Sequence, residues 1–223
     1  MDQSKLAYWE AQFLAYLREI DVHSDDASHD ISHFARVWRT CRYINEKEDN
    51  RGDLLVLLTA SYFHDLIPLP KDHPDRDQAS EFSALKTSAL LEDYFEGFPK
   101  DKIPAVAHAI HAHSFSAGIE PESFEAKVLQ DADRLDALGA IGIARTFYIA
   151  GKLRSSLFHP EDPLARERQP DDQRYALDHF EVKLRHLPDT MHTATGKAMA
   201  KERADYLDAF RARLVQELEG AAR

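Results

Sequence analysis

The chain has 223 residues, with 28 Lys plus Arg against 39 Asp plus Glu, and therefore a formal net charge of −11. A surface this acidic repels a long nucleic acid, which we do not expect as a partner, whereas a small anionic substrate can still bind where a metal ion and a few cations set the local charge. The single cysteine, Cys41, excludes an internal disulfide and a cysteine-based zinc finger.

Helical periodicity dominates the chain in order. Apolar residues recur at spacings of three and four over residues 6–20, which predicts an amphipathic helix. A second helix is expected over about Ile31–Glu48, with Ser28, Asp30 or Ser32 as its N-cap. Asp53 should cap a third, apolar helix that Pro68 and Pro70 stop. Further helices are expected at about Gln78–Glu96, Lys102–His113, Ser123–Leu138, Ile141–Ala150, Asp172–Arg185 and Thr193–Glu219.

Two segments are predicted to be irregular, because each contains three prolines and no apolar period: Pro68–Asp77 and Ser155–Asp172. No run of alternating β-branched residues and no internal repeat is present. The fold class predicted is all-α, a single helical bundle over residues 1–223, with the last long helix wrapping the bundle or forming a dimer contact; the oligomeric state is open.

Neither a signal peptide nor a membrane span is expected. The first residues lead into an amphipathic stretch without the apolar core of a signal peptide. The most apolar window, Leu54–Phe63, is too short to cross a bilayer. We therefore expect a cytoplasmic protein without a membrane partner.

The pair His64-Asp65 lies at the end of the apolar third helix. His64 shares a helical face with Leu57 and Ala60, so it should point inward. Burying an imidazole and a carboxylate is costly unless a partner satisfies both. A divalent cation would do so; the alternative is a set of buried polar groups that satisfy one another.

Two further residues extend this set. His33 shares a face with Val37 and Cys41 and should also point inward, and Asp133 lies on a predicted helix with an apolar stripe. Two imidazoles and two carboxylates leave positions open for water and substrate. Such ligands suit Mn, Fe, Co, Ni or Mg better than a structural zinc ion.

The pattern H…HD…D, spread over separate helices, resembles the HD-domain phosphohydrolase superfamily. The strings HDISHFARV, YFHDLIPLPKDHPDR, HAIHAHSFSAG, EAKVLQDADRLDALGAIGIARTF and DHFEVKL are similar, more narrowly, to its bacterial YedJ-like group. The resemblance runs from about Ser28 to Leu218. It implies a single HD domain, with a metal-binding core at about 28–150 and C-terminal helices at about 172–219 packing on it.

The resemblance implies that His33, His64, Asp65 and Asp133 ligate one divalent ion, with a second ion left open. It also implies hydrolysis of a phosphate ester or anhydride of a small phosphorylated metabolite, such as a nucleotide, by metal-activated water. Asp65 would both ligate the ion and accept a proton from that water, which makes it the catalytic residue.

One departure limits this transfer. Several HD hydrolases carry an acidic pair shortly after the HD motif, where this chain has Pro68 and Leu69. An alarmone hydrolase is therefore disfavoured, and Asp72, Asp75 and Asp77 are the nearest acidic substitutes. The alternative function is a catalytically silent HD-fold module that binds a nucleotide for regulation.

Five residues are further candidates for substrate contact: Lys71, His73, Arg76, His113 and Lys183. The first three follow the HD motif in a loop, where cations suit phosphate oxygens, although a solvated charged loop is the alternative. His113 would bind phosphate or a second metal ion, or else lie at an exposed helix end. Arg36 and Arg134 are candidates to pair with a ligating carboxylate.

Overall fold

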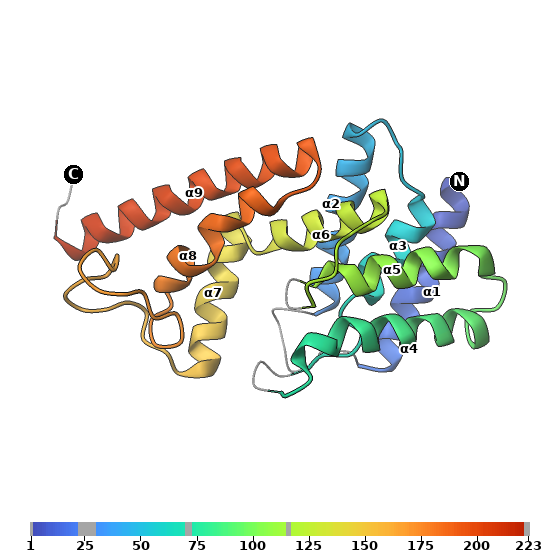
Figure 1. The fold of residues 1–223 in the computed structure, drawn as a ribbon, viewed down its shortest axis with the longest axis horizontal. Coiled ribbons are helices and arrows are strands. Elements are labelled where there is room, and N and C mark those ends of the chain that lie inside the picture. The colour runs from blue at the N-terminus through green and yellow to red at the C-terminus, as the bar shows by residue number, and fades with distance from the viewer. Residues whose placement is uncertain (1, 22–29, 70–72, 115–116, 221–223) are drawn as a thin grey trace. The chain divides into compact units, whose positions relative to one another are not determined.

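The computed structural model describes residues 2–21, 30–69, 73–114 and 117–220. Over these residues the fold is all-α, as predicted, and the only β-type pairing is an isolated bridge between Ser156 and Tyr175. The chain forms two compact units, residues 1–133 and 134–223, which meet in sequence inside helix α6 (Figure 1). Each unit is described separately, and the expectation of a single domain stays a prediction.

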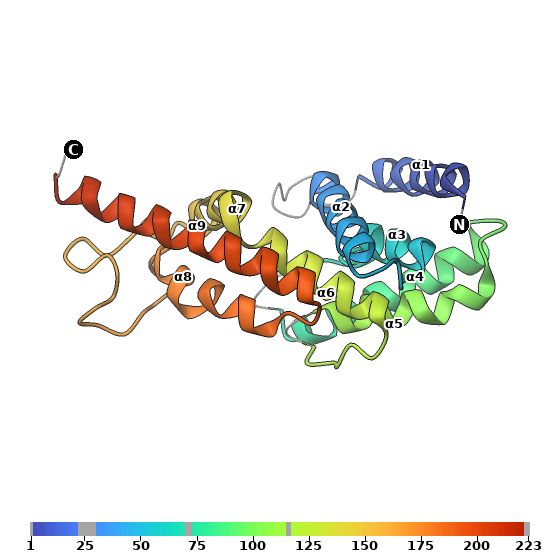
Figure 2. The same ribbon diagram turned by 90° about the horizontal axis from the view of Figure 1, so that it is seen from above.

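The first unit is built around a helix that is buried on all sides. Its six α-helices are α1 (Gln3–Glu19), α2 (Ile31–Lys47), α3 (Leu54–Phe63), α4 (Ala79–Asp93), α5 (Ile103–His113) and α6 (Phe124–Asp136). Helix α3 contacts α1, α2, α4 and α5, and every side chain from Leu55 to Phe63 is buried (Figures 1 and 2). Such burial explains why α3 is apolar around its whole circumference. It also means that the residue following α3, His64, emerges inside the unit.

An aromatic cluster holds α1 and α4 against α3. The ring of Phe13 lies edge-on to Phe63 at 5.0 Å and to Phe95 at 5.1 Å, and Trp9 lies edge-on to Phe98 at 5.2 Å. Edge-to-face pairs at these distances stabilise beyond their buried area. The cluster fixes the far side of α3 from the unit's polar residues.

Aspartates start the helices that matter for the site. Asp30 accepts a hydrogen bond from the backbone N–H of His33, so it is the N-cap of α2 among the three candidates. Asp53 accepts from Leu55 and Val56 and is the N-cap of α3, as predicted. Each cap satisfies donors that the first helical turn leaves unpaired. The starting positions of α2 and α3 are therefore set by short polar residues.

The second unit contains α7 (Gly139–Leu153), α8 (Asp178–Val182), a 3₁₀ helix (Leu184–Thr190) and α9 (Ala194–Leu218). The helix predicted over Asp172–Arg185 is wrong, since α8 has only five residues. The Asp178 carboxylate accepts a hydrogen bond from the Asp171 N–H at 2.6 Å, which holds the preceding residues in a turn. Pro188, inside the 3₁₀ helix, prevents a longer α-helix after it.

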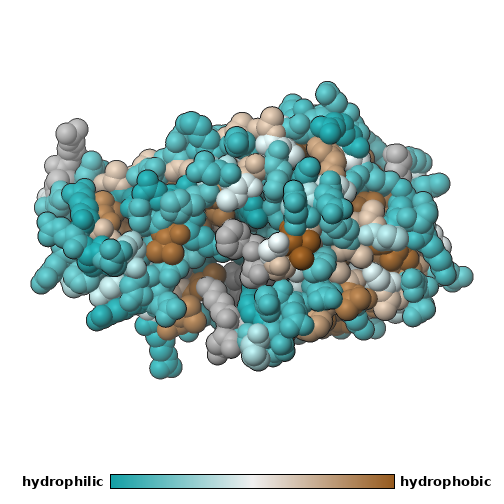
Figure 3. Space-filling model, viewed as in Figure 1, coloured by the Kyte–Doolittle hydropathy of each residue, from teal (hydrophilic) through white to brown (hydrophobic). Residues whose placement is uncertain are grey.

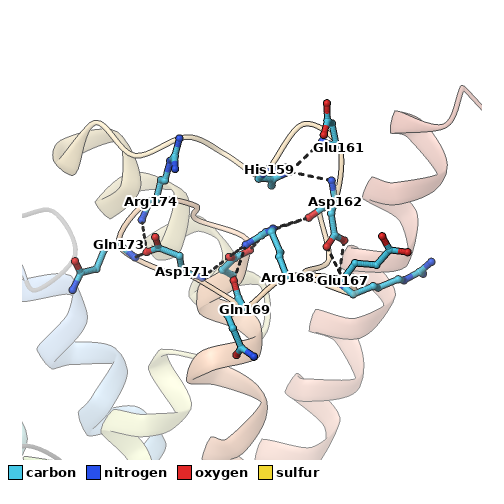
Figure 4. Close-up of polar contacts among 11 residues, drawn as sticks. His159, Glu161, Asp162, Glu167, Arg168, Gln169, Asp171, Gln173 and Arg174 are labelled. Atoms are coloured by element: carbon cyan, nitrogen blue, oxygen red, sulfur yellow. Dashed lines mark hydrogen bonds and ion pairs between the residues drawn. The ribbon is translucent and has the colours of Figure 1, made fainter.

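The irregular segment predicted at Ser155–Asp172 is present and is held by side chains (Figure 4). Arg168 donates two hydrogen bonds to Asp178, at 2.5 and 2.7 Å, and its guanidinium lies 4.8 Å from the centre of the Tyr175 ring. Asp162 accepts from the N–H groups of Arg166 and Glu167. Polar contacts thus replace the missing helix as the source of order.

The surface is largely hydrophilic on the face drawn in Figure 3, in keeping with the 30% of charged residues. Within the described ranges, no helix combines the length and the apolar character that a bilayer crossing requires.

Candidate metal centre

Five side chains from four helical segments converge in the first unit. His33 lies in the first turn of α2, His64 and Asp65 directly follow α3, His113 is the last residue of α5, and Asp133 lies in α6. Residues distant in sequence therefore meet because α2, α5 and the end of α3 pack together. All four predicted metal ligands are in this group.

The ligating atoms lie close to one another. The Nε2 atoms of His33 and His64 are 3.1 Å apart. One carboxylate oxygen of Asp133 lies 3.5 Å from the first and 3.8 Å from the second of these nitrogens. Ligating atoms of His33, His64 and Asp65 all lie within 4.8 Å of one another, a spacing that a single cation can bridge.

Backbone carbonyls fix the tautomers of two rings. His64 Nδ1 donates to the carbonyl of Ser61 at 3.0 Å, and His113 Nδ1 donates to the carbonyl of Ile110 at 2.6 Å. A carbonyl can only accept, so in the neutral rings Nδ1 carries the proton and the Nε2 lone pair faces the centre. Imidazoles that ligate metals are oriented by outer hydrogen bonds of this kind.

Burial and charge favour the protonation states that a cation needs. Burial lowers the pKa of His64 to about 4, although the Asp65 carboxylate opposes the shift. Burial alone would raise the pKa of Asp133, but His64, His33 and His113 outweigh it and hold that pKa below its ordinary value. At neutral pH, therefore, His64 is neutral and Asp133 is ionised.

Access is uneven across the centre. His33 and His64 are fully buried, while the side chains of Asp65 and Asp133 are 31% and 28% exposed. Solvent therefore reaches the centre from its carboxylate side. The mutual hydrogen bonding considered as an alternative accounts for the two rings, but it places both carboxylates against the same buried nitrogens without a neutralising ion.

His113 lies beside Asp65, with its Nε2 3.3 Å from one carboxylate oxygen and its ring 4.8 Å from that of His64. Burial would lower the pKa of His113, but the hydrogen bond to Asp65 and the charges of Asp65 and Asp133 raise it above its ordinary value. The exposed helix end considered for this residue is wrong, because His113 is only 5% exposed.

The remaining candidates lie elsewhere. Arg76 donates to the carbonyl of Leu69 at 2.8 Å, so its guanidinium closes the loop that follows the HD motif. His73 is exposed and 3.9 Å from Asp75. Lys71 lies outside the described residues, and Lys183 belongs to the second unit, between α8 and the 3₁₀ helix.

The two arginines considered as partners of a ligating carboxylate have other contacts. Arg36 donates to the hydroxyl of Ser32 at 2.8 Å. Arg134 donates to the carbonyl of Thr190 at 2.6 Å, within the second unit.

Two buried residues that support the centre were missed. Gln130 donates from its amide to the carbonyl of Ala112 at 2.7 Å, which ties α6 to the last turn of α5 beside His113. The Ser83 hydroxyl accepts from the Ile67 N–H at 3.0 Å, two residues after Asp65. The available signal was polar residues on otherwise buried helix faces, such as Gln130 between Leu129 and Ala132.

Comparison with known proteins gives the family of this chain. The HD domain family model matches residues 30–138. Protein YpgQ of Bacillus subtilis (strain 168) is 35% identical over 200 residues, which cover 88% of this chain and 87% of YpgQ.

Solved structures agree with the sequence match. The crystal structure of YpgQ in complex with ADP has a TM-score of 0.66 and 33% identity, and the match covers 93% of this chain and 96% of that one. An HD-superfamily hydrolase from Bacillus thuringiensis has a TM-score of 0.71 and 29% identity, over 97% of this chain and 100% of its own. The family model, the sequence relative and the structures all point the same way, and the chain belongs to the YpgQ-like proteins of the HD-domain superfamily.

Proposed function

We propose that this HD-superfamily hydrolase is a metal-dependent phosphohydrolase that cleaves a phosphate ester or anhydride of a small phosphorylated metabolite, most simply a nucleotide. The observation that carries the proposal is the convergence of His33, His64, Asp65 and Asp133, with neutral imidazoles buried and carboxylates facing solvent. The ADP complex of the relative YpgQ supports a phosphorylated ligand. The narrower YedJ-like assignment and a cytoplasmic location belong to the same proposal.

The four residues fit a divalent ion of the Mn, Fe, Co, Ni or Mg type, because nitrogen and oxygen donors are mixed and thiolates are absent from the set. When bound, such an ion lowers the pKa of water and withdraws charge from phosphoryl oxygens. Asp133 neutralises charge beside the two histidines, and its approach to both Nε2 atoms fixes the depth at which the ion is held.

Asp65 is placed to move a proton. One of its oxygens lies 3.7 Å from His64 Nε2 and the other 3.3 Å from His113 Nε2, so the carboxylate bridges a ligand and a second histidine. We assign it the acceptance of the proton released as water attacks phosphorus. His113 then stabilises the carboxylate by hydrogen bonding, and its Nε2 could equally contact a phosphate oxygen or a second ion.

Contacts to the rest of the substrate are proposed for Lys71, His73, Arg76 and Lys183. Among these, His73 is exposed in the loop after the HD motif. A cation in that loop would bind phosphate oxygens by charge-assisted hydrogen bonds.

The test is steady-state phosphate and pyrophosphate release from a panel of nucleoside mono-, di- and triphosphates with Mn²⁺ added. We expect turnover by the native chain and none by Asp65→Ala. Asp93→Ala is the matched control, because Asp93 is an exposed aspartate of α4 in the same unit. Equal turnover by Asp65→Ala and the native chain would sink the proposal.

One observation favours a second candidate function, a nucleotide-binding module without turnover: Pro68 and Leu69 stand where related hydrolases carry an acidic pair. In that case nucleotides raise the melting temperature of the native chain. No phosphate is then released with any metal.

A further inference from the structure

A second polar site lies on the outer face of α2, away from the metal centre. A hollow of about 330 Å³ is found where the first turn of α1, the outer face of α2 and the first turn of α3 meet, and all its lining residues belong to the first unit. Its lining includes Arg39, Arg42, Tyr43, Glu46 and Asn50. The volume is at the lower end of the range for small-molecule sites.

The hollow and the metal centre use opposite sides of one helix. His33, Val37 and Cys41 face the core of the unit and are fully buried, whereas Arg39 and Arg42 are exposed. Successive residues of a helix are about 100° apart, so these two sets point in different directions. The hollow is therefore not an extension of the substrate site proposed above.

Its two guanidiniums are unusual for so acidic a chain. Within residues 2–21, 30–69, 73–114 and 117–220, neither Arg39 nor Arg42 has a carboxylate at ion-pair distance. Other arginines of this chain are paired, for example Arg145 with Asp136 at 2.8 Å. Two arginines three residues apart lie on the same helical face, so their positive charges add at one place.

The hollow is also partly organised in advance. The Arg42 guanidinium lies 5.6 Å from the centre of the Trp38 ring, a cation–π contact that restricts its motion. Asn50 has a left-handed backbone (φ 54°), held by a hydrogen bond from its N–H to the Asn45 carbonyl at 2.8 Å. That turn brings the Asn50 side chain to the wall of the hollow, and such conformations are uncommon in non-glycine residues.

We propose that this hollow binds a small phosphate-bearing molecule at a site separate from the metal centre. Paired guanidiniums bind phosphate oxygens through several charge-assisted hydrogen bonds. Glu46 beside them disfavours a ligand that is anionic throughout, and it would accept a hydrogen bond from a hydroxyl or amino group of the ligand. Tyr43, which is 46% exposed, offers an aromatic face to a planar group. A phosphate joined to a hydroxylated or planar moiety is the class of ligand that satisfies all three.

Calorimetric titration of the full chain with AMP and with inorganic phosphate tests this site. We expect AMP to bind Arg39→Gln/Arg42→Gln at least about tenfold more weakly at this site than it binds the native chain, since two charged donors are lost. In Asp65→Asn, whose change lies at the metal centre, the same binding should remain. The matched control is Arg18→Gln/Lys86→Gln, which removes two exposed cations outside the hollow and should bind as the native chain does.

Three outcomes would overturn the proposal. The first is unchanged affinity in Arg39→Gln/Arg42→Gln. The second is an equal loss in Arg18→Gln/Lys86→Gln, which would reduce the effect to net charge. The third is complete loss of AMP binding in Asp65→Asn, which would place all binding at the metal centre. Circular dichroism of each variant checks that the helices remain, and binding of phosphate as tightly as AMP would limit recognition to the two arginines.

Discussion

The two units each bury charged side chains, but they satisfy them differently. In the second unit Asp178, whose side chain is 1% exposed, accepts two hydrogen bonds from Arg168 and one from the backbone of Asp171. One carboxylate thus has one matched cation. In the first unit, two carboxylates and three histidines face one another, and the two fully buried rings place their Nε2 atoms 3.1 Å apart.

The difference distinguishes a structural ion pair from a ligand-binding centre. A buried pair that is complete by itself contributes order, and removing one partner is costly. A cluster of lone pairs and carboxylates without a matching cation needs one from outside. Four experiments can break or sharpen this comparison.

The largest effect is expected from removal of a metal ligand. Asp133→Ala and His33→Ala should each lose the bound metal, and hydrolysis should fall more than about a hundredfold, beyond what loss of an outer partner causes. The helices should remain, because both residues lie in helices with many other buried contacts. Elemental analysis and circular dichroism measure the two properties, and full metal occupancy in either variant would contradict the ligand assignment.

Breaking the ion pair of the second unit should cost stability and leave metal content unchanged. Arg168→Ala leaves Asp178 buried without its cation, and we expect a loss of about 3–5 kcal/mol in the free energy of unfolding. Urea unfolding measures it. The double variant Arg168→Met/Asp178→Leu removes both charges and should recover most of that loss. If the single and double variants were equally unstable, the pair would not be the cause.

The cap of α3 gives a smaller, pH-dependent effect. Burial raises the pKa of Asp53, but the Lys102 ammonium and the N–H groups of Leu55 and Val56 outweigh it and hold the pKa below its ordinary value of 3.8. The ionised cap therefore stabilises the fold fully above that value, and the contribution is lost as the pH falls through the folded-state pKa.

Asp53→Ala should accordingly cost about 1 kcal/mol near neutral pH. The difference from the native chain should shrink as the pH falls below 3.8. Unfolding by urea at several pH values tests this. A constant difference over the whole range would show that the cap does not act through its charge.

The smallest effect concerns the reactivity of Cys41. Burial raises the pKa of its thiol to about 12, against a hydrogen bond with Ser61 that lowers it. At pH 8 a thiol reagent should therefore leave the native chain unlabelled and react only after denaturation. Mass spectrometry measures the labelling, and rapid reaction of the folded chain would mean that the core behind the metal centre opens readily.

Much of the first unit could be predicted from sequence, because its signals are local and strong. The inward direction of His33 follows from the positions of Val37, Cys41 and Ile44, all fully buried. Asp30 and Asp53 mark helix starts by their type and place. The convergence of His33, His64 and Asp133 came only from the family resemblance, since helical period gives a face and not a distance.

The rest depends on contacts between residues that have no periodic signal. The short α8 follows from Asp178 binding Arg168 and the Asp171 N–H, and nothing in the local sequence indicates that choice. The burial of His113 depends on packing between α5 and the segment after α3, so its sequence alone left an exposed helix end equally open. The hollow beside Arg39 depends in the same way on where α1 and α3 begin.

Helix α3 sets a length as well as a position. It is ten residues long, capped at one end by Asp53 and followed at the other by His64 and Asp65. Inserting or deleting one residue between these points would rotate the pair by about 100° and move it about 1.5 Å along the axis. Conservative exchanges of side-chain volume inside α3 are tolerable, but a change in its number of residues is not. Homologous proteins that use the same centre should therefore differ in the composition of this helix and agree in its count.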